Sequence, residues 1–403
     1  MQKHQLIKFA GGTLKRVGNK ISITNKLLAL IKNELIPYRK RDEWGFCTKD
    51  KKIIIECKYQ EVYFYFENLA GIKKNNKWGF IDENGNEVIP CKYEQLYAFC
   101  NGYALVKENG WWGYIDNNGN QVIDCIYFEA HNFKSGLASV SDCGRWGLIN
   151  KKGNQVIKCK YDWIDKFEDG LAIAEIDDKQ GYIDTNGNEV IKLTYDNANP
   201  FINGLAVVED QNKFFLINKE SKKVRSLKYD KVGFFEEGLA EVELNNKYGY
   251  INQIGDLVIP LKYDYARGFN NGLAEVSMME GYFDKYGYID KNGFQIIPFI
   301  FDEAFPFYFE GEFAKVKISS KWGIIDRIGN QIVPCIYDEV SYFHDGLTIF
   351  KINGKYGYID KTGQIVIDAM YDEADGFIEG IAKVKVNGQY GYINKKGEQY
   401  WED

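Results

Sequence analysis

Cysteine and histidine are the side chains in this sequence best suited to hold a metal ion or to act as nucleophiles. The 403 residues include eight cysteines and three widely separated histidines, and no Cys-x-x-Cys pair occurs, so the spacing of a zinc site is missing. Five cysteines share one recurring position, two residues before a tyrosine, where other parts of the chain carry Leu, Phe or Ala. We therefore expect reduced, metal-free thiols with a packing role. These cysteines are Cys57, Cys91, Cys125, Cys159 and Cys335.

Aspartates recur in Asp-x-x-Gly segments, such as Asp82 to Gly85, whose carboxylates resemble those of a calcium loop. In an EF-hand loop the glycine is sixth and a glutamate closes the loop at position twelve. Here the glycine is fourth and an apolar strand pattern follows at once. The segments therefore predict tight hairpin turns with glycine at positive φ, and no calcium site. The other examples are Asp116–Gly119, Asp184–Gly187 and Asp290–Gly293.

Motifs that carry catalysis are missing. The sequence has no Gly-x-Ser-x-Gly elbow and no His-Glu-x-x-His pair. The segment 11–20 has the wrong glycine spacing for a phosphate loop, with Asn19 where its lysine should stand. Three scattered histidines and recurring cysteines offer little for acid–base or thiol chemistry. We predict that the protein is not an enzyme and needs no cofactor.

One aromatic–glycine dipeptide returns along most of the chain, and Trp78-Gly79 is its clearest copy. Eight of the ten intervals between successive copies are 34 residues, and the other two are 38 and 36. A constant period of this kind predicts a tandem array in which each unit packs on its neighbours. The aromatic position is filled by Trp44, Trp78, Trp112, Trp146, Gln180, Phe214, Tyr248, Tyr286, Trp322, Tyr356 and Tyr390.

Each repeat reads as three short antiparallel strands: aromatic-Gly-Tyr-Ile-Asp, a Val-Ile-Pro run and Gly-Leu-Ala-x-Val. We expect the glycine to leave a space that a neighbouring ring covers, and the prolines at 90, 260, 298 and 334 to end the second strand. The predicted fold is all-β, with ten full repeats and a final hairpin at 390–403. Propeller blades usually have four strands and about 40 residues, so an open β-solenoid or superhelix is favoured, with a closed propeller-like ring as the alternative.

The repeat pattern resembles the WG-repeat family of bacterial proteins, over residues 42–403. The resemblance implies an interaction scaffold and brings no catalytic residues with it.

The first 41 residues lack the period and form a separate basic element. They carry ten Lys or Arg and one acid, a net charge of +9, which leaves −15 on residues 42–403 because the whole chain carries −6. The alternating patterns of segments 6–10 and 20–24 predict strands. The pattern of segment 26–36 predicts a helix with its apolar residues on one face, and Pro37 should end this helix. The element either caps the open end of the array or docks a partner. Its candidate binding residues are Lys15, Arg16, Arg39, Lys40 and Arg41.

Three places depart from the repeat. The unit at 214–247 has Phe215 in place of the glycine and Ser221 in place of the turn glycine, so we expect it to be weakened. Two further units contain insertions of four and two residues. Insertions in repeat proteins map to loops on one face, often the binding face, and Met and aromatic side chains favour interfaces. Candidate partner-binding residues are Met278, Met279, Tyr282, Phe283, Phe305, Tyr308 and Phe309.

Two functions remain open. The first is a cytoplasmic, non-catalytic adaptor that binds one or more proteins with a basic or extended contact surface. The second is an envelope-associated or carbohydrate-binding protein that uses rows of exposed aromatic rings. No apolar run is long enough for a membrane span, and no signal peptide is found. The acidic array is a poor match for nucleic acid, which only the basic N-terminal element could bind.

Overall fold

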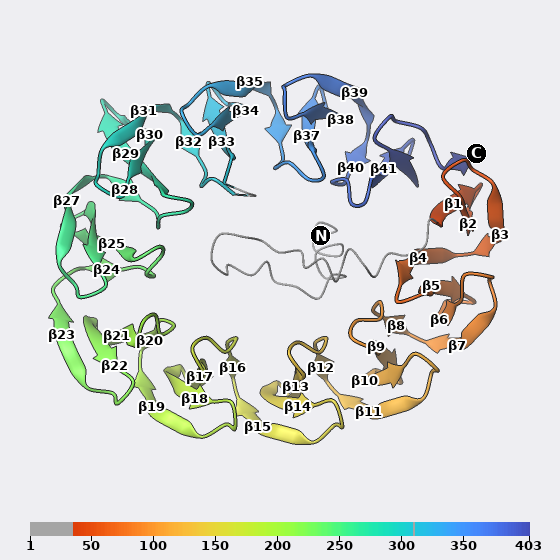
Figure 1. Cartoon of the computed structure of the whole chain (residues 1–403), viewed down its shortest axis with the longest axis horizontal. Coiled ribbons are helices and arrows are strands. Elements are labelled where there is room, and N and C mark those ends of the chain that lie inside the picture. Colours follow the sequence, from red (N-terminus) through yellow and green to blue (C-terminus); the bar gives the residue numbers. More distant parts are fainter. Residues whose placement is uncertain (1–34, 309–310) are drawn as a thin grey trace. The chain divides into compact units, whose positions relative to one another are not determined.

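The computed structural model describes residues 35–308 and 311–403, and every regular element in this part is a strand (Figure 1). The prediction of an all-β fold is confirmed. The described residues include no helix that could cross a membrane. The chain divides into two compact units, one of residues 1–164 with 389–403 and one of residues 165–388.

In the first unit the strands form small sheets in the orders β4-β5-β6-β7, β8-β9-β10-β11 and β12-β13-β14-β15, and a fourth sheet has the order β3-β2-β1-β43. The strands are β1 (Ile36–Lys40), β2 (Glu43–Cys47), β3 (Ile53–Tyr59), β4 (Glu61–Phe66), β5 (Leu69–Lys74), β6 (Lys77–Ile81), β7 (Glu87–Tyr93), β8 (Gln95–Leu96), β9 (Tyr103–Glu108), β10 (Trp111–Asp116), β11 (Gln121–Tyr127), β12 (Glu129–Ala130), β13 (Leu137–Asp142), β14 (Arg145–Asn150), β15 (Gln155–Tyr161), β16 (Trp163–Ile164), β42 (Gln389–Asn394) and β43 (Trp401–Glu402).

The second unit continues the same pattern, for example β24-β25-β26-β27 and β28-β29-β30-β31. Its strands are β17 (Leu171–Ile176), β18 (Lys179–Asp184), β19 (Glu189–Tyr195), β20 (Asn197–Ala198), β21 (Leu205–Asp210), β22 (Lys213–Asn218), β23 (Lys223–Leu227), β24 (Lys231–Val232), β25 (Leu239–Leu244), β26 (Lys247–Asn252), β27 (Leu257–Tyr263), β28 (Tyr265–Ala266), β29 (Leu273–Glu280), β30 (Phe283–Asp290), β31 (Gln295–Phe301), β32 (Glu303–Ala304), β33 (Phe313–Ile318), β34 (Lys321–Asp326), β35 (Gln331–Tyr337), β36 (Glu339–Val340), β37 (Leu347–Ile352), β38 (Lys355–Asp360), β39 (Ile365–Tyr371), β40 (Glu373–Ala374) and β41 (Ile381–Val386).

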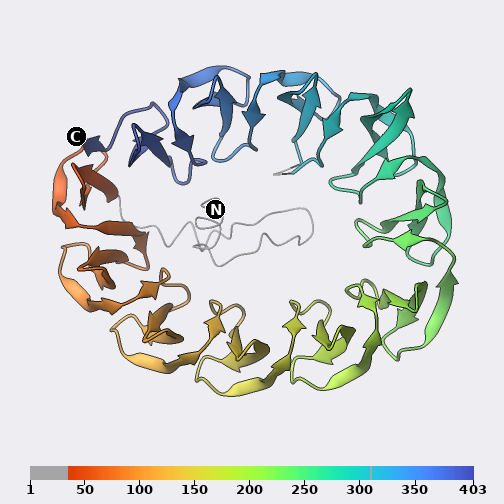
Figure 2. The ribbon, with the colours of Figure 1, turned by 180° about the vertical axis from the view of Figure 1, so that it is seen from behind.

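Each typical sheet has four antiparallel strands, one more than predicted, and they lie side by side in both views (Figures 1 and 2). The additional strand is usually only two residues long, as in β24, and lies in the short segment that follows the Val-Ile strand. The Gly-Leu-Ala-x-Val strand and the aromatic–Gly strand occupy the centre, and the Val-Ile strand lies at the edge. One sheet therefore takes its strands from two successive sequence repeats.

Backbone, and in most repeats not an aromatic ring, covers the glycine of the aromatic–Gly dipeptide. A Cβ added at Gly249 would lie 2.5 Å from the carbonyl oxygen of Ile259 in the adjacent edge strand. The ladder between β26 and β27 shifts register at this point, so the edge strand bulges over the glycine. The predicted ring packing is therefore wrong for this glycine, although Trp401 does lie over Gly391.

The unit at 214–247 shows what happens without that glycine. Phe214, Phe215 and Leu216 pair in unbroken register with the edge strand β23, which ends at Leu227, and the register shifts only after Leu216. The side chain of Phe215 leaves no room for the bulge, so the edge strand straightens. Ser221 keeps the left-handed turn conformation of the missing glycine, with φ of 61°.

The Asp-x-x-Gly segments form the predicted turns. Asp82 Oδ1 accepts hydrogen bonds from the backbone N–H groups of Asn84 and Asn86, at 2.9 and 2.8 Å, and Gly85 has φ of 80°. The pKa of Asp82 is lowered mainly by the side-chain hydrogen bond from Asn86 Nδ2 to Oδ2, at 2.9 Å, and the two backbone bonds lower it further. The prolines, in contrast, do not end the edge strand. Pro90 lies in the middle of β7, where the free edge requires no N–H donor.

The core lies between consecutive sheets. Tyr250 and Ile259 of one sheet pack with Phe269 and Val276 of the next. The hydroxyl of Tyr250 also donates a hydrogen bond of 2.7 Å to the carbonyl of Arg267 in the next sheet. The same bond, 17 residues along the chain, recurs for Tyr114, Tyr182, Tyr288 and Tyr358. The five repeats in which the tyrosine makes this bond thus hold their successors through packing and one buried bond, and repeats with Phe, Leu or Ile at this position, such as Leu148, rely on packing.

The two ends of the array share one sheet in the first unit. Arg39 and Lys40 of β1 pair in parallel with Trp401 and Glu402 of β43. This pairing is at odds with an open solenoid, whose first and last repeats stay apart, and it fits the propeller-like alternative with four-stranded repeats. The predicted final hairpin is reduced to a single bridge between Ile393 and Gln399.

Candidate partner-binding surface

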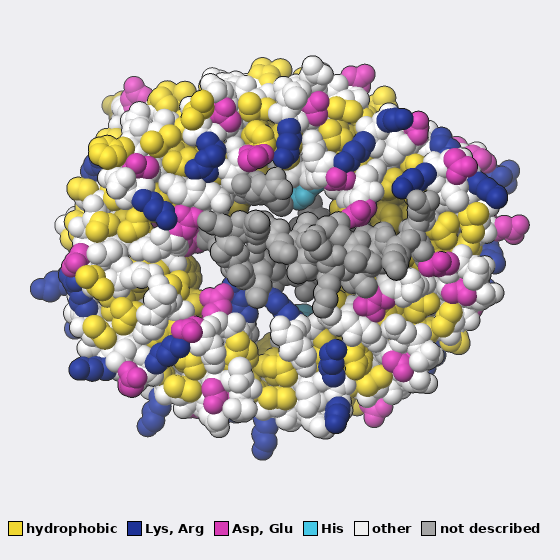
Figure 3. All heavy atoms as spheres, in the orientation of Figure 1, with side chains coloured by type: hydrophobic (Ala, Val, Ile, Leu, Met, Phe, Trp, Pro, Cys, Tyr) yellow, Lys and Arg dark blue, Asp and Glu magenta, His cyan; other side chains and the backbone are white. Residues whose placement is uncertain are grey.

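The four-residue insertion lengthens one hairpin. The strands β29 and β30 have eight residues each, where the corresponding strands of other repeats have five or six, and Met279 pairs with Asp284 beyond the regular sheet. The tip turns at Gly281, with φ of 68°. The exposed fraction is 62% for Met279, 97% for Tyr282 and 74% for Phe283, and Met278 is also exposed. Apolar side chains lie at the surface over these strands in the upper left of Figure 3.

Asp264 anchors the base of this hairpin. Its carboxylate accepts hydrogen bonds from the backbone N–H of Met279 at 2.9 Å and from Lys247 Nζ at 2.6 Å. The bond from Lys247 is the main cause of the lowered pKa of Asp264. Other repeats use the equivalent aspartate in the same way, and Asp302 holds the N–H of Ser319. The repeat therefore supplies a fixed base for an unusually long tip.

The second insertion lies elsewhere. Arg327 donates hydrogen bonds of 2.8 Å to the carbonyl of Gly311 and 2.7 Å to that of Asn271. These two residues lie in the loops that precede β33 and β29. Tyr308 is exposed, Phe305 is half-buried, and Phe309 lies outside the described residues. The tip at Tyr282 is at the other end of β29. The prediction that both insertions share one face is therefore wrong for the described part.

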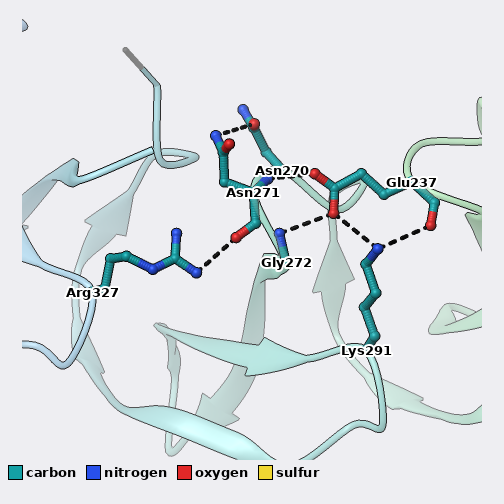
Figure 4. A network of polar contacts seen from close by, with 6 residues as sticks. All are labelled: Glu237, Asn270, Asn271, Gly272, Lys291 and Arg327. Carbon is teal, nitrogen blue, oxygen red and sulfur yellow. Dashed lines mark hydrogen bonds and ion pairs between the residues drawn. The ribbon is translucent and has the colours of Figure 1, made fainter. Parts of the chain in front are cut away.

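The loops around the second insertion are joined by polar contacts (Figure 4). Glu237 accepts hydrogen bonds from the N–H groups of Asn271 and Gly272 at 2.6 and 2.9 Å, and Lys291 lies 3.1 Å from its carboxylate. Burial alone would raise the pKa of Glu237, but the bonds from Lys291 and Gly272 lower it. These contacts stabilise the loops and leave their charges largely satisfied within the chain.

The basic residues assigned to the N-terminal element have different environments. Lys15 and Arg16 lie outside the described residues, as do nearly all of the predicted strands and helix. Arg39 is only 5% exposed and binds Asp403, while Lys40 lies 3.3 Å from Glu402. Arg41 is exposed, and its N–H binds the carbonyl of Glu402. Arg39 and Lys40 thus hold the C-terminal strand, and β1 extends the array into the segment predicted to precede it.

The residues that could do chemistry take packing positions. The Sγ of Cys159 lies 3.7 Å from the carbonyl oxygen of Val140, and the other four recurring cysteines face the equivalent carbonyl. All eight cysteines are free. His131 stacks on Trp146 with 5.0 Å between ring centroids, and burial lowers the pKa of His344. Among the described residues no three or more His, Cys, Asp or Glu side chains form a group that could hold a metal.

Among the described residues, the exposed aromatic side chains do not recur at one repeat position, as a row of rings along the array would. The Trp rings of the repeat dipeptide are largely buried, as at Trp78 and Trp112. The exposed rings of Trp111, Phe128 and Trp163 occupy three different repeat positions.

Sequence reasoning missed a second set of exposed apolar side chains, on turns of the second unit. Ile254 and Ile328 replace the residue that is Asn84 in the regular turn, and Phe294 replaces Asn86. All three are at least 60% exposed. The sequence does carry a signal for this set, because these turns have a large apolar residue where the regular turn has asparagine.

Comparison with known proteins identifies the repeat but no close relative. The model of the WG containing repeat matches ten successive segments from residue 44 to residue 390. No curated protein matches the sequence. A eukaryotic initiation factor structure is 10% identical, covers 82% of this chain and 94% of its own, and has a TM-score of 0.43. Kluyveromyces lactis Hsv2 is 8% identical, with 62% and 89% covered and a TM-score of 0.34. The ten matches place this chain in the family of proteins built from WG-containing repeats.

Proposed function

We propose that this protein is a non-catalytic repeat scaffold that binds a partner protein through the hairpin tip formed by Met278, Met279, Tyr282 and Phe283. The observation that carries the proposal is the exposure of these four apolar side chains on the only hairpin of the described array that the chain has lengthened. Large apolar side chains in water have a free-energy cost that burial in an interface removes. Methionine and aromatic residues are also enriched at interfaces.

The partner surface should be extended or basic. Residues 42–403 carry a net charge of −15, so a positively charged partner is attracted over a wide area while the apolar tip supplies the close contact. The role that best fits is an adaptor subunit in a cytoplasmic complex. Binding should weaken as salt is raised, because charges beyond about 8 Å are screened at physiological ionic strength.

The test is affinity purification from the source cells followed by mass spectrometry. A variant with Met279→Ser, Tyr282→Ser and Phe283→Ser should lose the captured partner while keeping its thermal midpoint, because all three side chains are mostly exposed. The matched control is Phe128→Ser with Phe234→Ser, which removes two exposed rings elsewhere. Capture of the same proteins by the tip variant and the parent would reject the proposal.

A further inference from the structure

A cluster of charged and aromatic side chains lies near the second insertion, in the second unit. The guanidinium of Arg267 is 5.8 Å from the ring centroids of Tyr265 and of Phe305. The Nζ of Lys315 is 5.3 Å from the same Phe305 ring and 4.8 Å from that of Trp322. Two cations from successive sheets therefore meet at one ring.

The other repeats show that packing does not require these two cations. At the repeat position of Arg267, the other repeats carry Tyr, His, Asp, Asn, Gly, Phe or Ser. At the repeat position of Lys315, most of the other repeats carry a small, apolar or acidic residue. Only Lys383 repeats the lysine, and Ser341 then takes the place of the arginine. Departures from a repeat consensus that packing does not explain are expected at functional sites.

The carboxylates beside Arg267 leave most of its positive charge uncompensated. The carboxylate facing Arg267 is that of Glu275, with 3.4 Å between Nε and Oε1. Glu275 is 2% exposed, and burial raises its pKa to about 8, so at neutral pH most of it is uncharged. The neighbouring carboxylates of Asp264 and Asp302 are bound by Lys247 and Lys285.

Hydrogen-bond donors are also available. Arg267 uses Nε to bind the Tyr265 hydroxyl at 2.6 Å, and its two terminal amino groups have no hydrogen-bond partner among the described residues. Its side chain is 42% exposed. The Oε2 of Glu275 has no partner there either, and a neutral carboxyl has a proton to donate.

We propose that Arg267 and Lys315 bind an anionic oxygen group, a carboxylate or phosphate, on a ligand whose apolar body packs against the rings of Tyr308 and Tyr342. The planar guanidinium suits the paired oxygens of such groups, and the lysine adds a second charge. The two tyrosine rings lie 5.4 Å apart edge to face, and the Tyr342 ring is 5.6 Å from Lys315 Nζ. The group could be carried by a protein segment or by a free small molecule. This site is separate from the hairpin tip and does not depend on its role.

Calorimetry with the full chain tests the site, using phenyl phosphate and benzoate as anionic probes and benzyl alcohol as the uncharged control. We expect the anions to bind, the alcohol not to bind, and the fluorescence of Trp322 to change on binding. Arg267→Gln and Lys315→Gln should each weaken binding about tenfold or more, the range for losing one charged partner. The matched control is Lys383→Gln, which removes the lysine that lacks an arginine neighbour and should leave the affinity unchanged.

Comparing the affinity of a phosphotyrosine peptide with that of phenyl phosphate distinguishes an anion carried by a protein segment from one carried by a small molecule. Tighter binding of the peptide indicates a protein segment, and equal binding indicates a small molecule. The proposal is overturned if no anionic probe binds, if both Gln variants bind like the parent, or if Lys383→Gln weakens binding as much as Lys315→Gln. Arg267→Lys, which keeps the charge, provides a second test should Arg267→Gln unfold at a lower temperature. We expect Arg267→Lys to bind better than Arg267→Gln, and a complete loss of binding in Arg267→Lys would contradict the proposal.

Discussion

Arg39 and Asp403, near the two ends of the sequence, form an ion pair with 2.8 Å between Nη2 and Oδ1. The Nε of Arg39 also donates a hydrogen bond of 2.8 Å to the carbonyl of Tyr390. The arginine is buried whereas the aspartate is mostly exposed, so the burial and the hydrogen bonds of Arg39 matter more than the attraction between the charges. This contact fixes β43 beside β1.

Removing this contact should destabilise the first unit. Arg39→Ala is expected to lower the free energy of unfolding by about 2 kcal/mol, because the carbonyl of Tyr390 loses its donor and the buried stem loses its packing. Lys40→Ala should cost less than about 0.5 kcal/mol, since both partners of the Lys40–Glu402 pair are exposed. Urea unfolding measures both. Equal costs would show that the ion pairs, and not the burial of Arg39, hold the strand.

Gly249→Ala should destabilise the second unit by about 1–3 kcal/mol, because the added Cβ meets the carbonyl oxygen of Ile259 at 2.5 Å and the bulge must flatten. Gly249→Val should cost more. The contrast is Gly110→Ala, whose φ of 84° costs about 1 kcal/mol but whose Cβ meets nothing within 4 Å. Thermal unfolding that ranks Gly110→Ala as the worse change would contradict the bulge explanation.

Tyr250→Phe removes only the hydroxyl that binds the carbonyl of Arg267 in the next sheet. We expect a loss of about 1–2 kcal/mol, because a buried carbonyl is left without its donor. Tyr356→Phe is the control, since its hydroxyl makes a long bond of 3.4 Å to Glu339 and should be worth less than about 0.5 kcal/mol. A loss at position 250 no larger than at position 356 would mean that the bond does not link the sheets.

The thiols should remain reduced and metal-free, with one fast-reacting group. Cys143 is the only exposed cysteine, so Ellman's reagent should show one fast thiol that Cys143→Ala removes. Burial raises the pKa of Cys91 and Cys335 to about 11. Because the folded pKa lies above the unfolded value of 9.0, these thiols contribute stability below pH 9.0 and lose it as the pH rises towards 11. Stoichiometric zinc by elemental analysis, or several fast thiols, would contradict the packing role.

The basic N-terminal element is best tested away from Arg39, which the fold needs. Lys15→Gln with Arg16→Gln removes two charges without touching the C-terminal contact. If the element recruits an acidic partner, this variant keeps its thermal midpoint and loses partner capture, and the loss resembles that caused by raised salt in the parent. A variant normal in both assays removes recruitment and leaves the capping role.

The periodic sequence was enough to predict an all-β array, the Asp-x-x-Gly turns and the packing cysteines. These features rest on local chemistry: glycine at 85 permits positive φ, the aspartate at 82 caps its own turn, and strands show in a two-residue alternation. Exposure of the inserted tip at Tyr282 could also be expected, because added polar and aromatic residues there have no consensus position to pack into.

Tertiary structure alone decided the fourth strand, the backbone bulge over Gly249 and the pairing of β1 with β43. A two-residue strand such as Lys231–Val232 has too few residues for any periodicity, so only its ladder to β25 reveals it. The burial of Arg39 could not be predicted from the sequence either, because its partner Asp403 lies 364 residues later in the chain. Sequence patterns report what a residue does to its near neighbours, and contacts closed over hundreds of residues depend on how the sheets stack.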